Sequence, residues 1–179
     1  LQELWETAVR GRAVDRTIAV TFDDGYFDVL GTAKPLLEEY EITATVFVPT
    51  GMMGRCREFW WDELERVILQ SPTLPDKLSV TTGGREYRWE LGGAARFSSD
   101  SHPGWRAWGQ PDPTARHRLY RSLYELLYGL QEAERLSLQD KLLAWAGVAS
   151  VPEKAERRVI SEDELVMLSG GSLITIGAH

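Results

Sequence analysis

A compact β-branched run that ends at two adjacent acidic residues constrains the fold more than any other feature. Residues 17–22 are apolar or β-branched, and Asp23 and Asp24 follow them at once. Such a run is typical of a buried parallel strand, whose functional side chains follow its carboxyl end. A helical pattern over residues 31–40 and a second β-branched run over residues 42–48 come next. The start of the chain therefore predicts a β-α-β unit.

The regular alternation of strand and helix is lost after the second β-branched run. Residues 62–70, 114–130 and 131–146 have apolar side chains at helical spacing, and residues 78–91 predict a hairpin that turns at two glycines. We therefore predict an insertion over residues 52–160 that is mostly helical and has a small core of its own.

The alternation returns over residues 161–179. Ser161 and Glu164 have the spacing of a capping box, in which a hydroxyl and a carboxylate bind backbone donors where a helix begins. A third β-branched run follows and ends at His179. The predicted fold class is α/β, with parallel strands from residues 1–51 and from this return segment, and with a mixed helical and hairpin insertion between them.

Composition disfavours several classes of protein. The formal net charge is −7, which argues against a nucleic-acid binder because phosphate binding depends on Lys and Arg. Cys56 is the only cysteine, so a metal must be bound by Asp, Glu or His. No apolar run reaches the roughly 20 residues that span a bilayer, and residues 1–12 lack a signal-peptide pattern. We expect a soluble chain, cytoplasmic or in the cell envelope, whose oligomeric state stays open.

Asp23, Asp24 and His179 are candidate site residues because side chains beyond the carboxyl ends of parallel strands converge on one edge. One of two adjacent carboxylates can bind a cation while the other takes a proton. Taken alone, Asp-Asp-Gly is more often a turn, and a single histidine is as often structural. His102 and His117 are alternative ligands, but their loop and amphipathic-helix positions favour solvent-facing roles.

Three segments of the sequence, in order, resemble the polysaccharide deacetylases, the NodB-homology domain of carbohydrate esterase family four. Residues 21–25 resemble the first motif of this family, residues 43–48 its second strand, and residues 176–179 the entry to its His-Ser/Thr-x-x-His motif. The resemblance implies a partial, distorted barrel of the (β/α)7 type. The long segment over residues 52–160 exceeds the short connection typical of the family.

Carried over residue by residue, the resemblance implies that Asp23 is the general base and that Asp24 and His179 bind a divalent metal ion. We expect Zn²⁺, with Co²⁺, Ni²⁺ or Mn²⁺ as alternatives. The second histidine of the motif and the later motifs of the family lie outside residues 1–179. The chain begins with Leu1 rather than Met, so we expect a part of a longer protein that is inactive by itself.

The predicted activity is hydrolysis of N-acetyl groups, or of O-acetyl groups, of a polysaccharide or amino sugar. For an N-acetyl group, the bond that breaks is a carbon–nitrogen bond that is not a peptide bond. The metal makes a water molecule acidic enough to attack, and Asp23 takes its proton. Tyr26 stands where many family members have proline, and Trp61 lies near a strand-end loop, so both are candidate substrate contacts. For the other tryptophans of the insertion we favour packing.

Three alternatives stay open at this stage. A Mg²⁺-dependent phosphoryl-transfer enzyme also has acidic residues after its first strand, although it commonly spaces them by one residue and His179 favours a softer metal. Hydrolases of other small amides use the same combination of base and metal. A non-catalytic carbohydrate-binding module is the third alternative.

Overall fold

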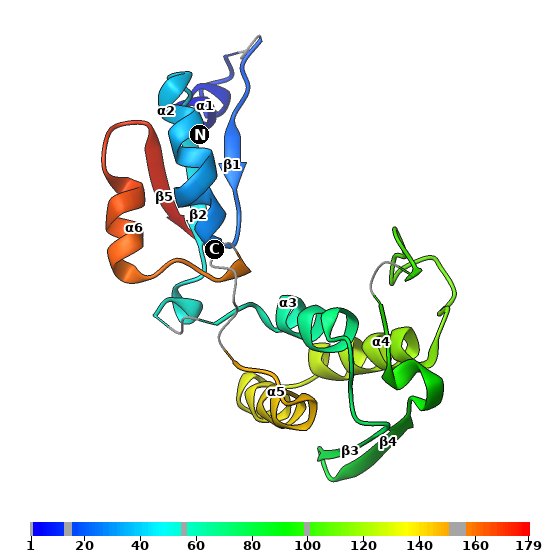
Figure 1. Ribbon diagram of the computed structural model, residues 1–179. Helices are drawn as coiled ribbons and strands as arrows, with labels where there is room; N and C mark the ends of the chain where they lie inside the picture. The colour runs from blue at the N-terminus through cyan, green and yellow to red at the C-terminus, as the bar shows by residue number, and fades with distance from the viewer. Residues whose placement is uncertain (1, 13–15, 55–56, 99–100, 151–156) are drawn as a thin grey trace. The chain divides into compact units, whose positions relative to one another are not determined.

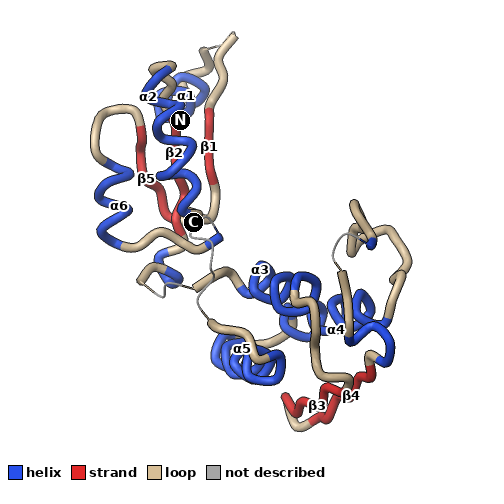
Figure 2. Tube along the Cα trace, in the orientation of Figure 1, coloured by secondary structure: helices blue, strands red, loops and turns tan. Residues whose placement is uncertain are grey.

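Two compact units make up the chain in the structure, which is a computed structural model (Figures 1 and 2). The first unit comprises Leu1–Glu58 with Val151–His179, and the second comprises Phe59–Ser150. Each unit has a hydrophobic core of its own. The residues that the structure describes are 2–12, 16–54, 57–98, 101–150 and 157–179.

A parallel three-stranded sheet organises the first unit. Its strands are β1 (Val20–Phe22), β2 (Ala44–Val48) and β5 (Ile174–Ala178), in the order β1-β2-β5. The predicted parallel strands are confirmed, although β1 is shorter than the predicted 17–22, because its ladder with β2 begins at Val20 opposite Ala44. The strands described in this unit form an open sheet, so closure into a barrel stays a prediction.

The helical segments that connect the strands of the first unit pack against this sheet. Helix α1 (Gln2–Val9) opens the chain, and the π-helical turn η1 (Val29–Ala33) with α2 (Lys34–Glu39) connects β1 to β2. Helix α6 (Glu162–Ser169) precedes β5 (Figure 1). One core joins the two connecting helices to the sheet, through Val29, Leu37, Val46, Ile160, Leu168 and Ile174.

Both ends of α6 are capped by side chains. The predicted capping box is confirmed, since Ser161 Oγ accepts a hydrogen bond from the Glu164 backbone at 3.3 Å and Glu164 Oε2 accepts one from the Ser161 backbone at 2.8 Å. At the other end, Lys34 Nζ donates to the carbonyls of Met167, Leu168 and Gly170. The Met167 carbonyl also accepts the Gly170 backbone N–H at 3.3 Å, and the ammonium complements the negative end of the helix dipole.

A bidentate ion pair holds the segment before α6. Arg158 donates from Nη1 to Glu164 Oε2 at 2.7 Å and from Nη2 to Oε1 at 2.6 Å, and its guanidinium lies 4.7 Å from the ring centroid of Phe27. The hydrogen bonds from Arg158, aided by the Ser161 backbone, lower the pKa of Glu164 to about 2. Glu164 therefore takes part in the capping box and in the ion pair at the same time.

The described part of the second unit contains the predicted hairpin, the three predicted helical segments and the short 3-10 helix η4 (Gly92–Ala95). Helix α3 (Trp60–Glu65) continues as the π-helical η3 (Arg66–Gln70), and α4 (Ala115–Tyr128) and α5 (Glu132–Ala146) follow the hairpin. Strands β3 (Lys77–Thr82) and β4 (Arg85–Glu90) pair antiparallel across Gly83 and Gly84, whose φ angles of 57° and 73° suit a two-residue turn. Among the described helices of the chain, none has the length and apolar character that crossing a bilayer requires.

The start of α4 corrects one expectation from the sequence. We expected His117 to face solvent beside charged neighbours, but His117 is 2% exposed and Arg116 is fully buried. The guanidinium of Arg116 donates hydrogen bonds to four backbone carbonyls, those of Ile68, Ser71, Ala94 and Ala95. These acceptors offset the desolvation of the charge, so a residue type that usually marks a surface lies in the interior.

We predict that Glu164→Gln destabilises the first unit at neutral pH and not in strong acid. The folded state holds the pKa of Glu164 near 2, below its ordinary value of 4.5. The stabilisation is therefore present above about pH 4.5 and is lost as the pH falls toward 2, with a magnitude of roughly 2–3 kcal/mol. Urea unfolding of both proteins at several pH values measures the difference.

Glu162→Gln is the matched control because it removes the same charge from the first turn of α6 at an exposed position. Its unfolding free energy should stay within about 0.5 kcal/mol of the unsubstituted protein. A destabilisation by Glu164→Gln that is equal at pH 7 and pH 2 would show that the ion pair is not its source.

Candidate functional site

The carboxyl edge of the parallel sheet brings together residues from distant parts of the chain. Asp23 and Asp24 follow β1, and His179 follows β5. His179 Nε2 lies 4.0 Å from Asp24 Oδ1, and the two side chains are 47% and 33% exposed. An acidic and an imidazole donor thus lie side by side at an edge that solvent reaches.

The loop after β1 crosses the end of β2 to bring Asp24 to His179. Strands β1 and β5 flank β2, so their ends are two strand spacings, roughly 10 Å, apart. Asp24 and Gly25 both have left-handed backbones, with φ of 68° and 59°. A Cβ on Gly25 would lie 3.0 Å from Val48 Cγ1, so only glycine lets the loop lie directly on this side chain. Aspartate tolerates the left-handed conformation better than most residues.

The end of β5 is equally constrained. The His179 backbone donates to the Val48 carbonyl at 3.1 Å, which extends the β2–β5 ladder beyond Ala178. A Cβ on Gly177 would lie only 2.7 Å from ring atoms of Phe47, so glycine leaves room for this ring over the neighbouring strand. Val48 therefore contacts both halves of the candidate site.

A short antiparallel bridge holds the other side of the acidic loop. The Phe27 backbone donates to the Arg158 carbonyl at 2.9 Å, the Ile160 backbone donates to the Gly25 carbonyl at 3.0 Å, and Tyr26 pairs with Val159. Because Arg158 is tied to α6 by Glu164, and α6 leads into β5, one helix supports both the Asp24 loop and the His179 strand. The sequence indicated Glu164 through its capping box, but no pattern indicated Arg158.

The Asp24–His179 pair fits part of a metal site. Two ligands at about 2.0–2.2 Å from a tetrahedral ion have donor atoms roughly 3.4 Å apart, so small rotations of either side chain close the observed 4.0 Å. Carboxylate oxygen and imidazole nitrogen are also ordinary ligands of zinc. Within the described ranges, no group of three or more His, Cys, Asp or Glu residues is arranged to hold a metal. Asp24 and His179 are thus two possible donors, and their role as metal ligands stays a prediction.

The remaining sequence candidates lie in different surroundings. Asp23 is exposed next to Asp24, and Tyr26 is half-buried by its pairing with the segment before α6. Trp61 belongs to the second unit, where its ring stacks on Phe59 at 4.6 Å and meets Trp60 edge-on at 5.5 Å. A substrate contact by Tyr26 or Trp61 stays a prediction.

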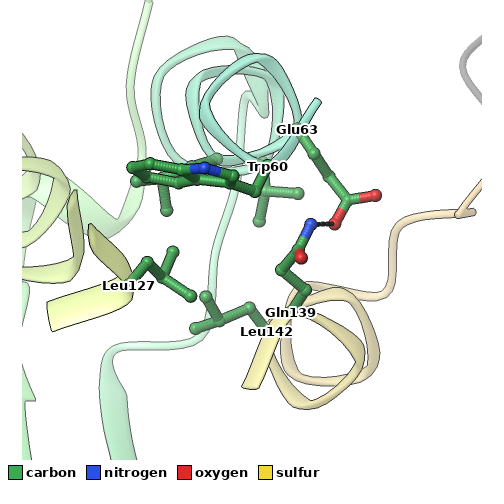
Figure 3. A pocket seen from close by; sticks show the side chains of 7 residues that line it. Trp60, Glu63, Leu127, Gln139 and Leu142 are labelled. Carbon is green, nitrogen blue, oxygen red and sulfur yellow. Dashed lines mark hydrogen bonds between the residues drawn. The ribbon is translucent and has the colours of Figure 1, made fainter. Parts of the chain in front are cut away.

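A small cavity in the second unit holds a buried polar pair (Figure 3). Gln139 extends from α5 toward Glu63 on α3, and its Nε2 donates to Glu63 Oε1 at 2.8 Å. Trp60, Leu127 and Leu142 surround the pair, and the cavity of about 10 Å³ has room for about one water molecule. This pair satisfies polar groups between packed helices and is too enclosed to be a substrate site.

We predict that Gly25→Ala displaces the acidic loop and destabilises the first unit by more than Gly11→Ala does. Both glycines have left-handed φ angles, 59° and 68°, but a Cβ on Gly11 meets no heavy atom within 4 Å. Gly11→Ala therefore measures only the cost of a left-handed backbone at alanine, about 1 kcal/mol of unfolding free energy. Any larger loss in Gly25→Ala comes from the contact with Val48. Chemical denaturation measures both variants, and equal losses of stability would contradict a steric role for this contact.

Of the comparisons with known proteins, the one with family models found a match. The family model for polysaccharide deacetylase matches residues 10–71. The matched segment contains β1, the Asp23–Asp24 loop and β2, and it ends before β5. Neither the curated proteins nor the solved structures include a significant match. The family match confirms the resemblance to the polysaccharide deacetylases over the segment that carries both aspartates.

Proposed function

We propose that this chain carries one side of the active site of a metal-dependent deacetylase that acts on N-acetyl, or O-acetyl, groups of a polysaccharide or amino sugar. The observation that supports this proposal best is the approach of Asp24 and His179 to 4.0 Å, directly beside Asp23. The family match over residues 10–71 supports the reaction class, hydrolysis of a carbon–nitrogen bond outside peptides.

In this proposal, the two adjacent aspartates have different roles. Asp24 and His179 are the residues that would hold a divalent metal, with Zn²⁺ expected. When bound, such an ion polarises an acyl carbonyl and makes water a better nucleophile near neutral pH. Asp23 stays exposed and takes the proton of the water molecule that attacks the acetyl carbonyl.

The remaining steps follow from the chemistry of an amide. A new carbon–oxygen bond forms as Asp23 accepts the proton, the carbon–nitrogen bond breaks, and the nitrogen leaves with a proton. The products are acetate and a free amine. The site needs a nearly fixed loop, because a base displaced by about 1 Å loses much of its effect. The contacts of Gly25 with Val48 and of Phe27 with Arg158 supply that restraint.

We predict separate effects for the two aspartates in the full-length protein. Asp23→Asn should keep the bound metal and lower acetate release from an N-acetylated chito-oligosaccharide by about 100-fold or more, because the base is lost. Asp24→Ala should lose the metal as well as the activity. Atomic emission measures the metal content.

Asp28→Asn, at an exposed position in the same segment, is the control that should keep both the bound metal and the activity. Unchanged hydrolysis by intact Asp23→Asn protein would refute its role as the base.

We also predict that a chelator abolishes acetate release and that Zn²⁺ or Co²⁺ restores it, while Mg²⁺ does not, because an imidazole ligand favours the softer ions. The same preparations should not hydrolyse p-nitrophenyl phosphate in the presence of Mg²⁺. Robust phosphatase turnover would support the phosphoryl-transfer alternative instead. Formamido-sugars and small cyclic amides should be tested as substrates too. If only these are hydrolysed, the protein is still a hydrolase, but its substrate is not an acetylated sugar.

A further inference from the structure

The second unit contains an open hollow of about 400 Å³ between the end of η3 and the start of α4. This volume lies within the usual range of small-molecule sites, roughly 300–1,000 Å³. Ring side chains form one part of its lining, and a carboxylate with an amide forms another. The lining residues that matter here are Glu65, Gln70, Phe97, His102, Trp105 and His117.

The four rings make a cluster centred on His117. The His117 ring centroid lies 4.4 Å from that of Trp105, 5.0 Å from that of His102 and 5.3 Å from that of Phe97, and every contact is edge-on. Its Nδ1 is 2.8 Å from Thr114 Oγ1. Burial, with His102 nearby, lowers the pKa of His117, so this ring is neutral at pH 7 and can both donate and accept hydrogen bonds.

This ring cluster lies at the margin of the main core of the second unit, where Trp105 meets Tyr120 edge-on at 6.0 Å. That core joins leucines of α4 and α5 to η3 and the hairpin, and it includes none of the four rings. His102 Nδ1 is enclosed, and among the described residues it has no hydrogen-bond partner. An enclosed polar atom without a hydrogen-bond partner lowers the stability of the folded state. Two imidazoles therefore pack less favourably in such a cluster than apolar rings would. We expect such a cluster where a ligand or water supplies polar groups.

The lining also selects the chemistry of the ligand. No Lys or Arg is among the described residues that line the hollow, which disfavours a phosphate or carboxylate ligand. The Glu65 carboxylate already accepts a hydrogen bond from Gln70 Nε2 at 3.0 Å, and an ionised carboxylate only accepts. A matching ligand must therefore present hydroxyl or amino donors to Glu65 and a nonpolar C–H face to the rings.

We propose that this hollow is an accessory site for a single sugar ring, whose hydroxyl or amino group donates to Glu65 while its C–H face packs on the ring cluster. The choice of sugar rests on the proposed deacetylase function. The site lies wholly within the second unit and uses none of Asp23, Asp24 or His179. In this proposal, the inserted segment binds a further sugar unit of the polymer.

The test follows histidine ring signals by NMR in the full-length protein with Asp23→Asn, which prevents turnover. His102, His117 and His179 are the three histidines of this sequence, and they report on the two sites separately. The probes are glucose, glucosamine, N-acetylglucosamine and its tetramer. We expect the ring signals of His102 and His117 to shift until the site is saturated. Comparing the affinity for glucosamine with that for N-acetylglucosamine distinguishes an amino donor from hydroxyl donors.

Glu65→Gln should weaken this binding by about tenfold, because it removes the charged acceptor and keeps the shape of the side chain. Glu125→Gln, at an exposed position on α4, is the matched control and should leave the affinity within about twofold. Equal affinities of the two variants overturn the proposal.

Two further outcomes also overturn it, and both are read in the protein with intact Glu65. In one, no probe moves the His102 and His117 signals. In the other, the sugars move His179 alone, which leaves the proposed active site in place and removes the accessory site. Conversely, shifts of His102 and His117, together with a protein that has intact Asp23 but neither holds metal nor releases acetate, would reject the proposed function and keep the sugar site.

Discussion

The contact of Gly25 with Val48 is the constraint on which the candidate site depends. Two strand spacings separate β1 from β5, and carboxylate and imidazole side chains do not bridge that distance while the loop continues along its own strand. The left-handed backbone of Asp24 and Gly25 turns the loop across the end of β2, where a side chain at Gly25 would meet Val48. The same strand end holds the His179 backbone. One buried valine thus sets the separation of both donors.

Electrostatic contacts at α6 stabilise this arrangement from outside the sheet. Lys34 caps the carboxyl end of the helix from the connection after β1, and Glu164 joins its amino end to Arg158, which pairs with the loop at Phe27. The Arg158–Glu164 pair is partly shielded from solvent, where charge-assisted hydrogen bonds are stronger than at a fully exposed surface. Of the hydrogen bonds from Lys34, the one to Leu168 is partly buried. The helix therefore supports two chain segments that are far apart in the sequence, and each carries one donor.

Local patterns were the features that sequence could predict. The β-α-β unit, the hairpin across Gly83 and the capping box at Ser161 each depend on residues within a few positions of one another, and the structure has all three. The expectation for His117 was wrong because burial is a property of the whole fold. Four carbonyls from η3 and the turn after β4 accept the hydrogen bonds of the neighbouring Arg116, and no local pattern shows that they are within reach.

The sequence alone determined which chemical groups are available: adjacent aspartates after one strand, a histidine after another, and one cysteine, which leaves carboxylates and imidazoles as ligands. It also indicated the resemblance to the polysaccharide deacetylases, because short motifs depend on residue identity and order. Tertiary structure decided that Asp24 rather than Asp23 is paired with His179, that Arg158 supports their loop, and that two other histidines meet in a ring-lined hollow. These juxtapositions depend on strand order, on left-handed loop backbones and on packing between distant segments, which residue order does not specify locally.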